Sequence, residues 1–157
     1  MARTFEYSGG AESGAAPSQV WAVLADPSTY ESWWGAWHSA SGEAPLSLGA
    51  TVTMHTVDHD PDVGGASEVR RLRNLPMKVI ELEEPRRLTI LNKSVGEERF
   101  IFTLNDSPPG TRIEYRRETR APRLLSFLGR AMRGRLEAEA AQSAAALAKL
   151  AGERSAG

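Results

Sequence analysis

The apolar residues between positions 17 and 33 recur with a helical period. The apolar stripe consists of Val20, Trp21, Val23 and Leu24. Pro17 suits the first turn of this helix, and Asp26-Pro27 ends it, because the residue before a proline is pushed out of helical geometry. Asp26 can also serve as the N-cap of a second helix. The pattern therefore predicts two short helices that meet at a corner.

Elsewhere apolar and polar residues alternate, which predicts β-strands. The clearest strand contains the sequence ERFIFTLND, in which Phe100, Phe102 and Leu104 share a face. The turn sequence SPPG follows it and leads into a strand whose second face alternates in charge and suits water. Short turns between successive strands indicate an antiparallel sheet, although Gly9 and Gly10 weaken the first strand. The predicted strands span residues 3–13, 36–42, 50–57, 75–84, 87–94, 97–105 and 110–120.

A long amphipathic helix is predicted over residues 123–151. Its apolar stripe consists of Leu125, Leu128, Met132, Leu136, Ser143, Leu147 and Leu150. Its far side is expected to carry Arg130, Arg133, Arg135, Glu137 and Glu139. The alanine-rich half, residues 138–148, is small enough to lie close against a sheet, whereas Gly129 and Gly134 each cost about 1 kcal/mol relative to alanine.

The composition is that of an ordinary globular protein, with 41% hydrophobic and 25% charged residues in a chain of 157. We expect a single domain over residues 1–157. No apolar run approaches the roughly 20 residues of a membrane-spanning helix, and the N-terminal sequence MARTFEYSGG lacks the apolar stretch of a secretory signal. The absence of cysteine excludes disulfides, thiolate metal sites and cysteine nucleophiles. We expect a cytoplasmic protein.

The net charge of −1 conceals a basic segment. Residues 112–135 contain eight arginines against Glu114 and Glu118, which gives +6 for the segment and −7 for the remainder. Two differently charged solvated faces explain this asymmetry, and the alternative is a surface that faces an anion. The apolar and basic residues 123–135 would suit peripheral contact with an anionic membrane. Nucleic acid is disfavoured, because the acidic remainder would oppose its binding.

The order of a strand, two short helices, six strands and one long helix resembles the helix-grip arrangement. AAPSQVWAVLADPSTYESW is similar to the opening signature of the START-like (SRPBCC) superfamily, and the C-terminal helix looks like that of its polyketide cyclase/dehydrase-like branch. The resemblance implies an α+β fold, in which a curved seven-stranded antiparallel sheet wraps around the long C-terminal helix. ESWWGAW also resembles the Trp-Trp-Gly segment of chaperone-ATPase activators, but Ala36 stands where those proteins have proline.

The helix-grip resemblance implies a ligand cavity between the sheet and the long helix. All four tryptophans lie within residues 17–37, and three of them cannot share one helical face, so we expect at least one to border the cavity. The alternative is that they plug the corner and leave no cavity. Strand alternation and the resemblance give the expected ligand-binding residues: Trp33, Trp34, Trp37, Met54, Phe100, Phe102, Ile113, Tyr115, Arg117, Leu125, Leu128 and Met132.

Arg117 is unusual, because strand alternation places it on the covered side of the sheet, where arginine is rarely unpaired. Either the strand end frays and Arg117 reaches solvent, or Arg117 anchors a carboxylate or enolate oxygen of the ligand. Tyr115, two residues earlier, could donate a hydrogen bond to the same ligand. These two residues are the only candidates for catalysis, and whether the chain is an enzyme stays open.

We expect no metal and no cofactor. The candidate metal ligands are His55, Asp58, His59, Asp60 and Asp62. The Asp-x-Asp-x-Asp pattern superficially resembles a calcium loop, but Val63 and Val69 occupy the positions that need glycine and glutamate. The two histidines, four residues apart, would converge on a helix but lie where a strand leads into a loop. No Gly-x-Ser-x-Gly sequence and no phosphate-cradling glycine loop is present. His38 and the other two histidines have no evident orienting partner for a general base.

The sequence therefore predicts a protein that binds a hydrophobic, partly aromatic small molecule bearing an anionic or carbonyl group, as a monomer or homodimer. The family resemblance implies polyketide cyclase/dehydrase-like activity. In that mechanism the pocket folds a flexible substrate while Arg117 and Tyr115 stabilise oxyanion charge. The alternatives are a non-catalytic lipid or small-molecule carrier and a chaperone-activator-like protein-interaction module without an open cavity.

Overall fold

A computed structural model describes residues 2–59, 70–94, 96–122 and 126–156. The helical elements are α1 (Pro17–Leu24), the 3-10 turn η1 (Pro27–Thr29), α2 (Tyr30–Trp33) and α3 (Ser126–Ala156). The strands are β1 (Ala2–Ser13), β2 (Ser39–Ser41), β3 (Thr51–His59), β4 (Arg70–Glu83), β5 (Arg87–Asn92), β6 (Glu97–Ser107) and β7 (Gly110–Pro122). This order and the antiparallel sheet confirm the predicted helix-grip arrangement, and β2 is shorter than expected.

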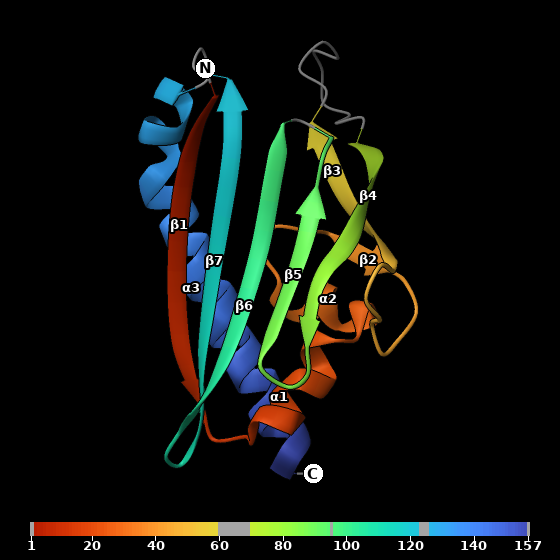
Figure 1. Cartoon of the computed structure of the whole chain (residues 1–157), viewed down its shortest axis with the longest axis vertical. Coiled ribbons are helices and arrows are strands. Elements are labelled where there is room, and N and C mark those ends of the chain that lie inside the picture. The colour runs from red at the N-terminus through yellow and green to blue at the C-terminus, as the bar shows by residue number, and fades with distance from the viewer. Residues whose placement is uncertain (1, 60–69, 95, 123–125, 157) are drawn as a thin grey trace.

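The sheet has the strand order β1-β7-β6-β5-β4-β3-β2, so the first and last strands of the chain are neighbours. Figure 1 shows α3 crossing one face of this sheet diagonally, with α1 beside its C-terminal half. We call the face of the sheet turned toward α3 the inner face and the opposite one the outer face. The predicted corner forms as expected, because Asp26 Oδ1 accepts a hydrogen bond from the Ser28 amide at 3.1 Å.

Gly9 lies where α3 approaches β1 most closely. A Cβ atom at Gly9 would come within 2.6 Å of the Ala140 carbonyl carbon and would also clash with the backbone of Ala141. The glycine that weakens β1 as an isolated strand is thus required for the helix to dock. Close docking also explains the small side chains of the helix, since Ala140, Ala144 and Ala148 are buried against the sheet.

The inward face of α3 differs from the predicted one at two positions. Glu139, expected on the solvent side, is half-buried, and its carboxyl group bonds to buried Ser143. Met132, expected to close the pocket, is 41% exposed. From Met132 onward, where burial along α3 is described, the buried positions include Ala140, Ser143, Leu147 and Ala151. The segment of α3 between Met132 and Ala140 is therefore less covered than the C-terminal half of the helix.

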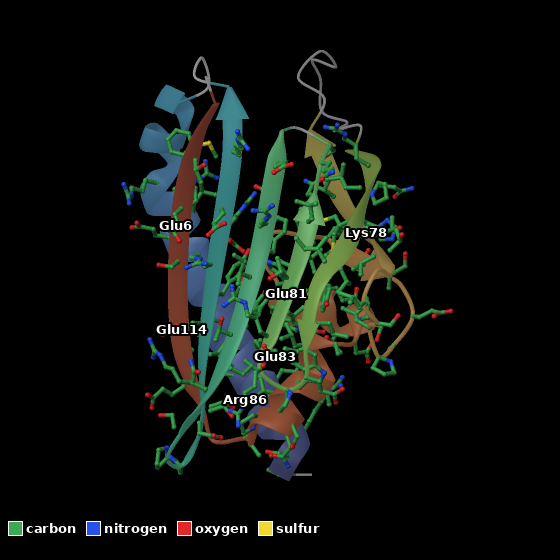
Figure 2. The ribbon with its side chains drawn as sticks, in the orientation of Figure 1. Glu6, Lys78, Glu81, Glu83, Arg86 and Glu114 are labelled. Atoms are coloured by element: carbon green, nitrogen blue, oxygen red, sulfur yellow. The ribbon has the colours of Figure 1, made fainter. Side chains whose placement is uncertain are left out.

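The outer face of the sheet carries the charges that alternate along β7. Arg116 forms an ion pair with Glu6 of β1 at 3.0 Å and another with Glu118 at 3.2 Å. Figure 2 shows Glu6, Glu81 and Glu114 on this same face, turned away from α3. The charge ladder predicted to face water is thus outside, and the aromatic residues of β6 and β7 face α3.

Candidate ligand-binding site

Trp33 and Trp34 fill the corner between α2 and the inner face of the sheet. Their rings stack with centroids 5.4 Å apart, and both side chains are buried. Trp33 Nε1 donates to Thr29 Oγ1 at 3.0 Å, and Trp34 Nε1 donates to the Tyr115 hydroxyl at 3.1 Å. Because a buried indole N–H requires a partner and both have one, these two tryptophans are a satisfied core.

Tyr115 is enclosed by the same cluster. Its ring stacks on Phe102 at 4.6 Å and is fully buried, with its hydroxyl group held by Trp34. Burial raises the pKa of the Tyr115 phenol well above its ordinary value, so the hydroxyl stays protonated. The hydroxyl oxygen therefore already has a hydrogen-bond donor within the core.

Trp37 differs from these two tryptophans. Its side chain is only half-buried, yet its Nε1 atom is buried and has no hydrogen-bond partner among the described residues. Its ring packs edge-on against Phe100 at 5.6 Å and lies 6.1 Å from the ring of Trp34. Trp37 therefore presents an aromatic surface and an unused donor next to the core.

Arg117 is neither frayed into solvent nor unpaired. Its Nη2 and Nε atoms lie 2.7 Å and 2.8 Å from Oε2 of Glu98, and the two side chains are only 19% and 13% exposed. The guanidinium carbon lies 5.2 Å from the centroid of the Phe100 ring, a cation–π contact. Burial acts to lower the pKa of Arg117, but the attraction of Glu98 raises it overall.

Glu98 is held in turn by neighbouring strands. Thr119 Oγ1 donates to its Oε2 at 3.3 Å, and Asn92 Nδ2 lies 3.5 Å from its Oε1. Sequence reasoning missed Glu98, although a signal was present: it precedes Phe100 by two residues and must share its face. The ion pair is thus held in place by side chains of β5, β6 and β7.

Glu139 approaches the ion pair from α3. Its Oε1 accepts a hydrogen bond from Ser143 Oγ at 2.9 Å, and Ser143 Oγ accepts one from the Gly35 amide at 3.1 Å. Its Oε2 is buried without a partner among the described residues, and burial raises the pKa of this carboxyl group. The missed signal is the spacing, because a residue four positions before Ser143 lies on the same face of the helix.

We call Trp37, Glu98, Phe100, Arg117 and Glu139 the inner polar site. It lies beside the packed corner, because the ring of Trp37 contacts that of Trp34, and it is less buried than that corner, since Trp37, Glu98 and Glu139 are only half-buried. The site combines an aromatic wall, a compensated ion pair, one unused donor and one unused acceptor. Such a small number of polar groups in an apolar surrounding is typical of sites that orient a small molecule.

The other predicted site residues fall in three places. Met54, Phe100, Phe102 and Ile113 are fully buried in the core. Leu125 lies outside the described residues, as do Asp60 and Asp62 of the acidic loop, and the side chains of Leu128, Asp58 and His59 are not described. His55 lies on the outer face, where its Nδ1 is 2.7 Å from Asn74 Oδ1 and its Nε2 is 3.1 Å from Ser41 Oγ.

A separate depression of about 1120 Å³ runs over β1, β7 and β6, and its lining extends to Arg133 and Glu137 of α3. Its lining includes Glu6, Glu114, Arg112 and Arg116, so carboxylates and guanidinium groups face each other across it. Phe5 and Tyr7 also line it, and Arg116 pairs with Glu6 there. We assign the ligand to the inner polar site instead, because that site places the Trp37 Nε1 donor and the Glu139 Oε2 acceptor beside a buried aromatic wall. Within the described part of the chain, no His, Asp and Glu side chains cluster as metal ligands would, and no helix there is long and apolar enough to cross a membrane.

Comparisons with known proteins agree with this architecture. Residues 4–152 match the profile of the family described as polyketide cyclase/dehydrase and lipid transport. Protein SA2116 from Staphylococcus aureus, of unknown function, superposes with a TM-score of 0.72 at 8% identity, covering 99% of this chain and 97% of that one. TTHA0849 from Thermus thermophilus superposes with a TM-score of 0.71 at 12% identity, covering 96% of this chain and 99% of that one. At these identities the likeness establishes the fold alone.

A third similar structure belongs to a protein of a biosynthetic pathway. The di-domain ARO/CYC protein StfQ from the steffimycin biosynthetic pathway superposes with a TM-score of 0.68 at 14% identity, covering 98% of this chain and 52% of StfQ. This chain thus spans about half of the two-domain protein. No curated protein sequence matches the chain.

Proposed function

Because this chain belongs to the polyketide cyclase/dehydrase and lipid transport family, we propose that it binds a hydrophobic, partly aromatic small molecule at the inner polar site. The observation that carries the proposal is Trp37, a half-buried indole whose buried N–H has no partner among the described residues. A ligand oxygen accepting from Trp37 Nε1 would satisfy that donor, while the Phe100 and Trp37 rings would cover its apolar body.

The family and the fold shared with StfQ support a cyclase- or dehydrase-like reaction as an extension of this proposal. Oxyanion charge developing in such a reaction would be met by the unused Trp37 N–H, because two nitrogen atoms of Arg117 are already bonded to Glu98. We assign Tyr115 no direct part in this role, because its side chain is fully buried and its hydroxyl oxygen accepts the hydrogen bond of Trp34 Nε1. A carrier of lipids or other small molecules would use the same site without the reaction.

The test uses intrinsic fluorescence, with the protein titrated in parallel with planar polycyclic phenols and with fatty acids. We expect saturable quenching of the tryptophan fluorescence. The folded protein should be stabilised by about 2.7 kcal/mol when the free ligand concentration is about 100 times the dissociation constant. Trp37→Phe keeps an aromatic ring but removes the donor, so affinity should fall about tenfold. Trp33→Phe, at a buried tryptophan bonded to Thr29, is the control whose affinity should change little.

The two ligand classes separate the alternatives. Binding of the phenols favours the cyclase-like extension, and binding of the fatty acids favours the lipid carrier. Absence of saturable binding by both classes, with the variants correctly folded, would contradict a small-molecule site and would favour a protein-interaction module.

A further inference from the structure

The inner polar site has no spare positive charge among its described side chains. Arg117 is the one cation at the site, and two of its nitrogen atoms already bond to Glu98. Glu139 then adds a second carboxyl group that no described cation neutralises directly. An anionic ligand would therefore meet carboxylates rather than an available guanidinium group, which is the reverse of the anchor expected from the sequence.

The unused hydrogen-bonding atoms are one donor and one acceptor. Trp37 Nε1 is the donor and Glu139 Oε2 the acceptor, and both are buried without partners among the described residues. The segment that carries Trp37 is connected to Glu139 of α3 by hydrogen bonds. The Gly35 amide bonds to Ser143, which bonds to Glu139, and the Ala36 amide lies close enough to Glu139 to favour its ionised form.

A hydroxyl group is the natural complement of such a pair. It donates one hydrogen bond and accepts others, whereas a carboxylate only accepts. A phenol or enol hydroxyl could donate to Glu139 Oε2 and accept from Trp37 Nε1, with its ring against Phe100. A carboxylate in the same place would satisfy Trp37 but would leave Glu139 facing a like charge.

Resting on the proposed function above, we propose that the inner polar site selects a neutral aromatic ligand with a phenol or enol hydroxyl group over an aromatic carboxylate, and that Glu139 sets this selectivity. Like charges placed together at a half-buried site are strongly disfavoured, so the exclusion of the carboxylate is as important as the attraction of the hydroxyl.

The selectivity should depend on pH. The groups that act on Glu139 from the elements packed against it are Arg117 and Tyr115 of β7, Glu98 of β6 and Ser143 of its own helix. Burial raises the pKa of Glu139, so acidification protonates it earlier than an exposed glutamate. A protonated Glu139 can donate to a carboxylate, and the preference for the hydroxyl should weaken as pH falls.

The test compares 2-naphthol with 2-naphthoate, which share a ring system and differ in charge near neutral pH. Isothermal titration calorimetry on the full chain should give at least about tenfold tighter binding of 2-naphthol. Glu139→Gln keeps an acceptor and removes the charge, so 2-naphthoate should gain about tenfold while 2-naphthol changes little. Glu139→Leu removes the acceptor, and 2-naphthol should lose about tenfold.

Glu137→Gln is the matched control, because Glu137 lies on the same helix, pairs with Arg133 and is about half exposed. Its binding of both probes should equal that of the unmodified protein. The inference would be overturned if 2-naphthoate bound as tightly as 2-naphthol or more tightly, or if Glu139→Gln left the ratio of the two affinities unchanged. The proposed function would still hold in either case, provided that Trp37→Phe weakens binding. If neither probe binds, both proposals fall.

Discussion

Arg117 and Glu98 form an ion pair across two adjacent strands, with Nη2 and Oε2 2.7 Å apart on the inner face of the sheet. The register explains the contact: Arg117 pairs with Phe100 and Thr119 pairs with Glu98, so the two charged residues are diagonal neighbours on one face. Each charge alone would be costly at this depth. Together they allow β6 and β7 to carry polar groups beside the aromatic core.

Removing one member of this pair should destabilise the protein. Glu98→Leu or Arg117→Met leaves the partner uncompensated, and we expect the free energy of unfolding to fall by about 3 kcal/mol in each case. The double variant should lose much less than the sum, because no charge is then left behind. Urea denaturation of the four proteins measures this coupling.

Arg133→Met is the control for the ion-pair prediction, since its pair with Glu137 is largely exposed. Its effect should stay below about 0.5 kcal/mol. Additive losses in the double variant would show that Arg117 and Glu98 stabilise the fold independently.

The fold could be predicted because it depends on patterns that are local in the sequence. The six later strands show alternation, the long C-terminal helix shows a helical period, and Asp26-Pro27 marks the corner between the two short helices. The START-like resemblance that these patterns supported is confirmed by the family match. The inner polar site was predicted less well. Which cation meets which carboxylate depends on strand register and on the rotation of α3, and neither is encoded in residue spacing alone.

The tryptophans illustrate the same limit. The sequence indicated that Trp33, Trp34 and Trp37 could not share one face, but not which of them would lack a partner. That depended on Thr29 and Tyr115, the second of which lies 81 residues away from Trp34. Trp33 and Trp34 pack into the corner as the expected plug would, whereas the ring of Trp37 is half-buried, as a ligand-facing ring would be.

Glu139→Gln should make the fold more stable at neutral pH. Burial raises the pKa of Glu139, so the folded state holds its proton more tightly than the unfolded state. The contribution of Glu139 to the free energy of unfolding is therefore fully present below the unfolded pKa of about 4.5, and it is lost as pH rises through the folded pKa. The melting temperature of the variant should exceed that of the unmodified protein at neutral pH, and the difference should shrink as pH approaches 4.5. A constant difference across this range would contradict the assignment.

Tyr115→Phe should be costly although it removes a single oxygen atom. The Tyr115 hydroxyl accepts the hydrogen bond of Trp34 Nε1, and both side chains are buried, so the variant leaves an indole N–H without a partner. We expect a loss of about 2 kcal/mol in the free energy of unfolding, measured by urea denaturation. A loss below about 0.5 kcal/mol would mean that the ring packing, and not the hydrogen bond, secures this corner.

Two glycine-to-alanine changes should have opposite signs, because one glycine is needed for contact and the other is not. At Gly9 an added Cβ atom would clash with the backbone of Ala140 and Ala141, which would force α3 away from β1 (Figure 1). We expect Gly9→Ala to lower the free energy of unfolding by at least about 2 kcal/mol, since neither backbone can yield without shifting an element.

Gly134→Ala is the counterpart within α3. No described residue lies within 4 Å of a Cβ atom at Gly134, so the substitution should raise the free energy of unfolding by about 1 kcal/mol through helix propensity alone. Thermal unfolding of the two variants measured side by side checks both signs. A tolerated Gly9→Ala would mean that α3 does not dock on β1 as closely as described, and the burial of Glu139 and Ser143 that depends on this docking would have to be reconsidered.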